Sequence, residues 1–199
     1  HLSLRRQRQM CIRDSINGQF GDIEDKKESD LIIISEITNL TILQIVQYKS
    51  STISINDITI DNLNMKSEVL SVSNNSNIRI IWNGPRNWLI VSSNKSILNE
   101  IHQKFDDDNF AVTDLSHSRA IIELEGNQAK EVLKKGCPFN FNELKKNNSL
   151  NSVYHGMSIT IDMLDDKPDK FRIFALRSFG ESLYHSITDA CLEFGYIGK

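Results

Sequence analysis

The sequence repeats one unit, in which two extended apolar runs joined by a polar turn are followed by an amphipathic helix. In the first copy, runs at 78–82 and 88–92 flank Asn83-Gly84-Pro85, where glycine tolerates positive φ and proline fixes its own. This pattern predicts a hairpin. We expect a helix next, capped by Ser93 or Asn94. Its apolar stripe consists of Ile97, Leu98, Ile101 and Phe105.

The second copy has the same order close to the C-terminus. Runs at 158–164 and 171–176 flank a polar turn from Asp165 to Asp169. We expect the following helix to begin at Ser178, which would form a capping box with Glu181. The apolar stripe of this helix consists of Leu183, Ile187, Ala190, Cys191 and Phe194. Gly195 follows, where a left-handed cap is expected.

A third unit lies between the two copies, with runs at 111–114 and 118–125 and a short helix at 127–135. The repeated order predicts an α+β fold made of two ferredoxin-like halves, with antiparallel or mixed sheets and packed helices. The predicted halves span residues 31–110 and 111–199, and they are free to interlock as one compact unit.

The first thirty residues differ from the rest. Residues 1–15 are rich in arginine, whereas the later basic residues are mostly lysine. We interpret 1–15 as a non-native extension, with a short basic arm as the alternative. Residues 16–30 are polar and contain Gly18 and Gly21, so we predict a flexible segment there and folded structure from about Leu31.

Composition excludes several classes of function. With 39% hydrophobic residues, 25% charged residues and a net charge of -3, the chain is globular and lacks the basic surface that nucleic acid requires. No apolar run approaches the roughly 20 residues of a membrane-spanning helix, so we predict no membrane association and a cytoplasmic protein. Cys11, Cys137 and Cys191 form no CxxC pair, which indicates reduced structural thiols.

The segment from Asp114 to Ser118 contains an acid, a hydroxyl and an imidazole, the ingredients of a nucleophilic site. Neighbouring residues of an extended segment point to opposite faces, however, and no G-x-S-x-G motif is present. We therefore predict a hydrogen-bonded turn and no catalytic residue in this chain.

Motifs for metals and nucleotides are also missing from the sequence. His102, His155 and His185 form no zinc-binding pair, and no GxGxxG or P-loop follows a strand. Gly126-Asn127 could hold an anion, but helix capping alone explains it. Cys137 follows the negative end of a helix, which raises a thiol pKa. The acids of the last hairpin are interpreted as a solvated tip: Asp162, Asp165, Asp166 and Asp169.

Trp82 and Trp88 flank the first turn, one on each strand of the predicted hairpin. Packing in the core or at a subunit interface fits them better than base stacking. We predict that this hairpin contributes to an interface.

Three collinear blocks of the sequence resemble the gamma subunits of heterotetrameric sarcosine oxidases. Residues 81–91 resemble W-x-G-P-x-x-W-L. Residues 113–138 are similar to the series D-x-S-x-x-R, G-x-x-A and L-x-K-G-C-P. Residues 177–179 and 193–195 match R-S-F and E-F-G. The resemblance covers most of the chain and implies a fold like the folate-binding domain of aminomethyltransferases.

The resemblance also implies a function and partners. Such complexes oxidatively demethylate sarcosine to glycine, forming hydrogen peroxide and 5,10-methylenetetrahydrofolate. The resemblance implies that this chain is a non-catalytic subunit without cofactor or metal, which helps assemble and stabilise the alpha, beta and delta subunits. FAD, FMN, NAD and tetrahydrofolate are then expected in those partner subunits.

One alternative is a stand-alone folate-binding protein that maintains iron-sulfur enzymes. Its family has a Lys-Gly-Cys motif followed by a polar stretch, whereas here Lys135-Gly136-Cys137 continues with Pro138 and Phe139. That departure removes the diagnostic part of the motif. A separate aminomethyltransferase would need a longer chain and an acidic folate contact that the sequence does not reveal.

Overall fold

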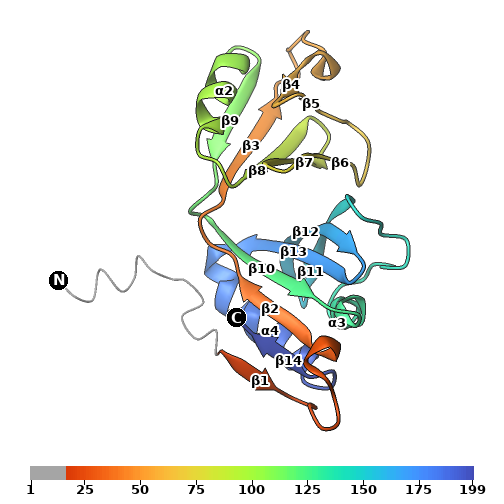
Figure 1. Ribbon diagram of the computed structural model, residues 1–199. Coiled ribbons are helices and arrows are strands. Elements are labelled where there is room, and N and C mark those ends of the chain that lie inside the picture. Colours follow the sequence, from red (N-terminus) through yellow and green to blue (C-terminus); the bar gives the residue numbers. More distant parts are fainter. Residues whose placement is uncertain (1–16) are drawn as a thin grey trace, which may run out of the picture. The chain divides into compact units, whose positions relative to one another are not determined.

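The computed structural model describes residues 17–199 (Figure 1). The predicted non-native extension at 1–15 and Cys11 lie outside the described residues. The chain packs as two compact units that are both discontinuous in sequence. Unit 1 contains residues 17–38, 118–146 and 151–199, and unit 2 contains residues 39–117 and 147–150.

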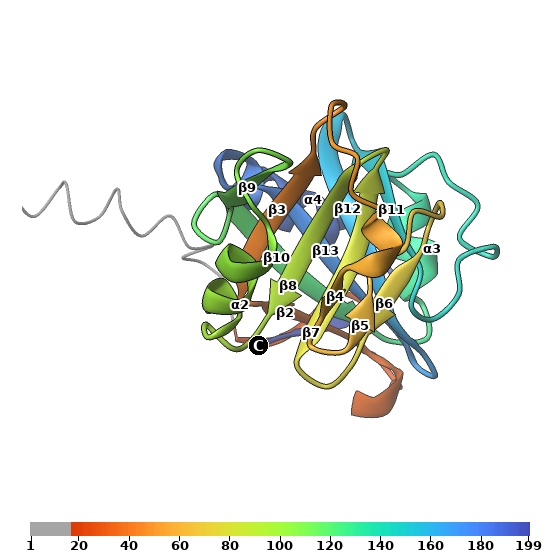
Figure 2. The same ribbon diagram turned by 90° about the horizontal axis from the view of Figure 1, so that it is seen from above.

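Unit 2 is built on a five-stranded sheet with the order β6-β7-β8-β3-β9, and a short two-stranded sheet pairs β4 with β5 (Figure 2). Its elements are β3 (Thr41–Gln47), η2 (Ile55–Asp57), β4 (Thr59–Ile60), β5 (Leu63–Asn64), β6 (Val72–Asn74), β7 (Ile78–Gly84), β8 (Asn87–Ser92), α2 (Ile97–Lys104) and β9 (Phe110–Asp114). The strand pairs of the larger sheet are antiparallel. The first predicted hairpin is therefore confirmed as β7 and β8.

The core of unit 2 forms where α2 packs on one face of this sheet. Ile97, Ile101 and Phe105, three residues of the predicted stripe, are buried in one cluster with Trp88 and Ile90. The helix begins later than predicted, because Asn94 accepts a hydrogen bond from the Ser96 amide at 3.0 Å and so closes a turn before the helix.

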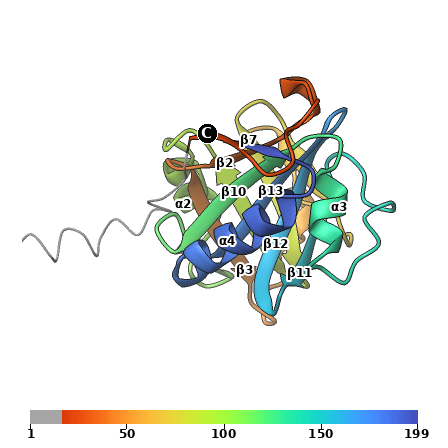
Figure 3. The same ribbon diagram turned by 90° about the horizontal axis from the view of Figure 1, so that it is seen from below.

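Unit 1 is built on a seven-stranded sheet with the order β1-β14-β2-β10-β13-β12-β11. Its elements are β1 (Gly18–Phe20), η1 (Glu28–Asp30), β2 (Ile32–Glu36), β10 (Arg119–Glu125), α3 (Ala129–Lys134), β11 (Ser149–Tyr154), β12 (Met157–Asp166), β13 (Asp169–Leu176), η3 (Arg177–Phe179), α4 (Gly180–Cys191) and β14 (Tyr196–Gly198). Helices α3 and α4 lie on the same face of the sheet (Figure 3).

Alternation along β10 and β13 gives the sheet of unit 1 two different faces. Ile122, Leu124 and Ile173 are fully buried, and the charged residues Glu123 and Arg172 point to the opposite face, where they pair across the strands. The second predicted hairpin is confirmed as β12 and β13.

The division of the chain differs from the predicted boundary between residues 110 and 111. Strand β2 pairs with β10 and, in parallel, with β14, so an early segment completes the sheet of the C-terminal elements. Strand β9 instead pairs with β3 in unit 2. The chain therefore passes from one unit to the other near residues 38 and 117.

The segment 16–30, predicted to be flexible, contains a paired strand. Strand β1 pairs with β14, and the Asp22 amide donates to the Leu192 carbonyl at 2.7 Å. The glycine is required here for close approach: a Cβ on Gly21, whose φ is +81°, would lie 2.3 Å from the Leu192 oxygen. The flexible interpretation is corrected accordingly.

Helix α4 also begins differently from the prediction. A 3-10 turn, η3, occupies Arg177–Phe179, and Phe179 takes the N-cap position without a side-chain cap, so the capping box of Ser178 and Glu181 is not formed. Gly195 does have the predicted left-handed conformation, with φ of +70°. Within residues 17–199, no helix is both long and apolar enough to cross a membrane.

Candidate functional site

The β7–β8 hairpin presents both tryptophans on one face. Trp82 lies directly opposite Trp88 across the strands. The turn uses Gly84, at φ +150°, and Arg86, at φ +58°, and the register shifts between Trp82 and Gly84. The predicted placement of one tryptophan on each strand of the hairpin is therefore confirmed.

The two tryptophans differ in exposure. Trp88 is 1% exposed, and its Nε1 donates to the Lys66 carbonyl at 2.7 Å. Trp82 is half-buried and packs against the edge of the same core cluster. Trp88 therefore packs in the core of its own unit. The interface predicted for the pair stays a prediction, and of the two residues Trp82 is the more accessible to a partner.

The segment Asp114 to Ser118 forms a turn between β9 and β10. The Ser116 amide donates to Asp114 Oδ1 at 2.8 Å, the Ser116 hydroxyl donates to the same oxygen, and this hydroxyl accepts from the Ile42 amide at 3.0 Å. The hydrogen bond from the Ser116 hydroxyl holds the Asp114 pKa below its usual value. The predicted turn is confirmed, because the hydroxyl is used to fix the backbone.

The two described cysteines are buried. Cys137 donates to the Ser152 hydroxyl at 3.1 Å, and burial raises its pKa. Burial raises the pKa of Cys191 to about 12. Thiols with raised pKa values hold little thiolate at neutral pH, so both fit the structural role predicted for them.

The solvated tip predicted for the acids of the β12–β13 hairpin is wrong for Asp162, which is fully buried within β12. Two of the other acids bind lysines of neighbouring segments. Asp165 pairs with Lys146, and Asp169 pairs with Lys130, each at 2.9 Å. In the part of the chain that the structure describes, no three His, Cys, Asp or Glu side chains gather in a way that could hold a metal ion.

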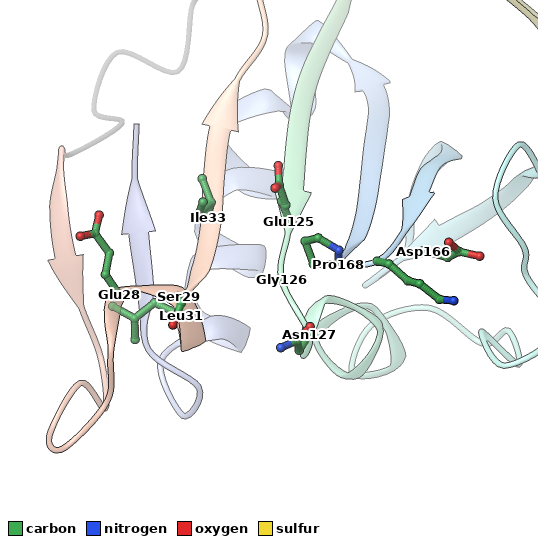
Figure 4. A pocket seen from close by; sticks show the side chains of 10 residues that line it. Glu28, Ser29, Leu31, Ile33, Glu125, Gly126, Asn127, Asp166 and Pro168 are labelled. Atoms are coloured by element: carbon green, nitrogen blue, oxygen red, sulfur yellow. The ribbon is translucent and has the colours of Figure 1, made fainter.

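A pocket of about 460 Å³ opens in unit 1 where β10 ends (Figure 4). Gly126 and Asn127, the pair considered for an anion, line it together with eight other residues, which include carboxylates on several elements. Its lining consists of Glu28, Ser29, Leu31, Ile33, Glu125, Gly126, Asn127, Asp166, Lys167 and Pro168. Three carboxylates beside one lysine disfavour an anion in this pocket. No local sequence pattern predicts that η1 and the β12–β13 turn meet here.

A charged ladder runs along the face of the unit 1 sheet opposite the helices. Nε and Nη2 of Arg172 donate to Glu123 Oε1 at 2.9 and 2.6 Å. Lys170 contacts Glu123 at 3.2 Å and Glu125 at 2.9 Å. The charges of this ladder neutralise one another, as expected for a structural network.

Comparison with known proteins adds to this geometry. No family model matches the chain. A curated relative, sarcosine oxidase subunit gamma from Corynebacterium sp. strain U-96, is 27% identical over 122 residues, which cover 60% of this chain and 58% of the relative. The match thus spans less than two thirds of the length of that relative.

The predicted likeness to sarcosine oxidase gamma subunits is confirmed. The motifs that suggested it fall on turns and helix starts: W-x-G-P-x-x-W-L on the β7–β8 turn, D-x-S-x-x-R on the turn before β10, and R-S-F on η3. These three motifs therefore include the turns that shape the backbone.

Solved structures show the fold. The heterotetrameric sarcosine oxidase from Corynebacterium sp. U-96, in complex with pyrrole 2-carboxylate, matches with a TM-score of 0.75 and 23% identity over 84% of this chain and 87% of that chain. The glycine cleavage system aminomethyltransferase T from Bartonella henselae matches with a TM-score of 0.60 and 15% identity, over 80% of this chain and 46% of that chain. The predicted α+β fold, shared with aminomethyltransferases, is confirmed.

Proposed function

We propose that this chain is the gamma subunit of a heterotetrameric sarcosine oxidase and acts without a catalytic site of its own. The observation that carries the proposal is the match to a curated gamma subunit, in a chain whose fold also matches that heterotetrameric enzyme. The complex would demethylate sarcosine to glycine and form hydrogen peroxide and 5,10-methylenetetrahydrofolate.

The geometry of the candidate residues supports a role in assembly. Ser116 holds a turn, Cys137 and Cys191 are buried with raised pKa values, and the Glu123–Arg172 ladder is internally neutralised. Each of these groups is occupied in maintaining the fold. In the proposal, FAD, FMN, NAD and tetrahydrofolate bind to the partner subunits, and this chain stabilises the alpha, beta and delta subunits.

The alternative of a stand-alone folate-binding protein has the aminomethyltransferase likeness in its favour. Its characteristic cysteine, however, would correspond to Cys137, which is 3% exposed and bound to Ser152. A buried thiol with a raised pKa is a poor reactive group. We therefore favour the subunit.

Co-expression tests the proposal. The chain, carrying an affinity tag, would be produced with the large subunits encoded beside its gene, purified through the tag, and examined for flavin absorbance and sarcosine-dependent peroxide. The proposal predicts a flavin-bearing, active complex and a colourless, inactive isolated chain. A chain that does not co-purify with those subunits and binds folate on its own would favour the alternative.

A further inference from the structure

The start of strand β10 carries a cation that the described chain does not pair. The Arg119 side chain is half-buried, and burial lowers its pKa. No side chain among residues 17–199 forms an ion pair or a hydrogen bond with its guanidinium. An arginine stays charged at any physiological pH, so it loses hydration here without gaining a counter-charge within the described chain.

Two exposed apolar side chains adjoin Arg119. Leu176 lies directly opposite Arg119 in the β10–β13 ladder, which places their Cβ atoms on the same face about 5 Å apart. Leu176 is 42% exposed, and Phe179, three residues further along the 3-10 turn, is 39% exposed. Leu176 is the N-cap of this turn, so Phe179 follows it within one short turn of the chain. Arg119, Leu176 and Phe179 are named the Arg119 patch.

The backbone holds the Arg119 patch in place. The Arg177 amide donates to the Ser118 carbonyl at 2.9 Å, which ties the start of η3 to the start of β10. Helix α4 continues directly from η3. The patch therefore stands on two paired strands and the turn that precedes a helix.

We infer that the Arg119 patch, formed by Arg119, Leu176 and Phe179, docks another subunit that brings a carboxylate to Arg119 and aliphatic side chains to Leu176 and Phe179. Charge complementarity decides the occupant. Arginine and aromatic residues are enriched in the buried centres of interfaces, and a carboxylate is the planar partner that a guanidinium fits best. One cation is too few for a nucleic acid or a lipid surface, which require several.

This inference rests on the proposed function, since the partner would be one of the large subunits. Photo-crosslinking within the co-expressed complex tests it. Benzoylphenylalanine replaces Phe179 in one preparation and Tyr48 in the other, because both residues are 39% exposed but Tyr48 lies in unit 2. We expect a covalent adduct between the chain and a large subunit only from position 179.

Charge reversal provides a second readout. We expect Arg119→Glu to reduce the recovery of large subunits with the tagged chain by at least about 10-fold, because it sets like charges against each other. The control Lys95→Glu reverses an exposed charge in unit 2 and should recover them as wild type does. Leu176→Ser, which leaves the charge in place, should give an intermediate loss. Circular dichroism of each isolated chain monitors folding.

The outcomes separate the two proposals. If the wild-type chain recovers no large subunit, the proposed function fails and the docking inference falls with it. If the wild type assembles but Arg119→Glu recovers as much as Lys95→Glu and position 179 yields no adduct, the docking inference alone is overturned. An adduct from position 179 to a second copy of this chain would also overturn it.

Discussion

Arg172 and Arg119 lie on neighbouring strands and point to the same face of the unit 1 sheet, yet their surroundings differ. Arg172, 15% exposed, donates twice to Glu123, which is 12% exposed. Arg119 has no such partner in residues 17–199. The difference separates a charge that stabilises this chain from a charge that is available to another one.

The two tryptophans of unit 2 repeat the contrast. Trp88 is buried and its Nε1 is hydrogen-bonded, whereas Trp82 is only half-buried. Residues satisfied inside the chain should affect folding, and residues left unsatisfied should affect assembly. This expectation orders the following predictions by the size of the effect on the free energy of unfolding.

Replacing Trp88 should have the largest effect. Trp88→Ala removes a fully buried indole and leaves the Lys66 carbonyl without its donor, so we expect the free energy of unfolding to fall by about 3–5 kcal/mol. Trp82→Ala should lower it by about 1–2 kcal/mol, because part of that indole is already in water. Urea unfolding of the isolated chain measures both. Equal losses would remove the distinction between the two residues.

Breaking the charged ladder should come next. Glu123→Ala leaves Arg172 and Lys170 without their shared carboxylate, which should cost about 2 kcal/mol, less than for a fully buried pair because water reaches the site. Glu131→Ala is the control, since Glu131 pairs with Lys134 while 50% exposed and should cost at most about 0.5 kcal/mol. If Glu131→Ala lowers the free energy of unfolding as much as Glu123→Ala does, the contrast between the ladder and an exposed ion pair is contradicted.

Removing Arg119 should leave the isolated chain nearly unchanged. Arg119→Ala breaks no ion pair among the described residues, so we expect a change within about 0.5 kcal/mol in the free energy of unfolding, together with weaker recovery of the large subunits. A loss close to that of Glu123→Ala would mean that Arg119 stabilises the fold, and the contrast with Arg172 would disappear.

The smallest predicted effect is a change in the free energy of unfolding at acidic pH. The Ser116 hydroxyl keeps the Asp114 pKa below the ordinary value of 3.8, so the ionised carboxylate contributes stability above that value and loses it as pH falls through the lowered pKa. We therefore expect the difference in free energy of unfolding between wild type and Ser116→Ala to narrow as pH falls below about 4. For Ser93→Ala, an exposed serine in the same unit, the difference should stay constant.

Local chemistry predicted the elements of this fold well. The turn residues Gly84 and Pro85 marked the β7–β8 hairpin, and the apolar spacing of Ile97, Ile101 and Phe105 marked α2. These signals act over a few residues, so a single sequence contains them.

Long-range pairing was not predictable in the same way. Gly21 suggested mobility, but the structure uses it for close approach to Leu192, and a glycine allows either. The parallel pairing of β2 with β14 joins segments from opposite ends of the chain, and no local pattern encodes it. The Arg119 patch was not predicted from the sequence for the same reason. It depends on the register of β10 with β13 and on the 3-10 turn that follows β13.

Native mass spectrometry of the co-expressed assembly tests the central claim most directly. The account predicts a flavin-containing particle in which one copy of this chain is bound to the larger subunits, and it predicts that the wild-type chain stays bound at salt concentrations that release the Arg119→Glu chain. Detection of this chain only as a free monomer, beside an intact complex of the other subunits, would contradict it.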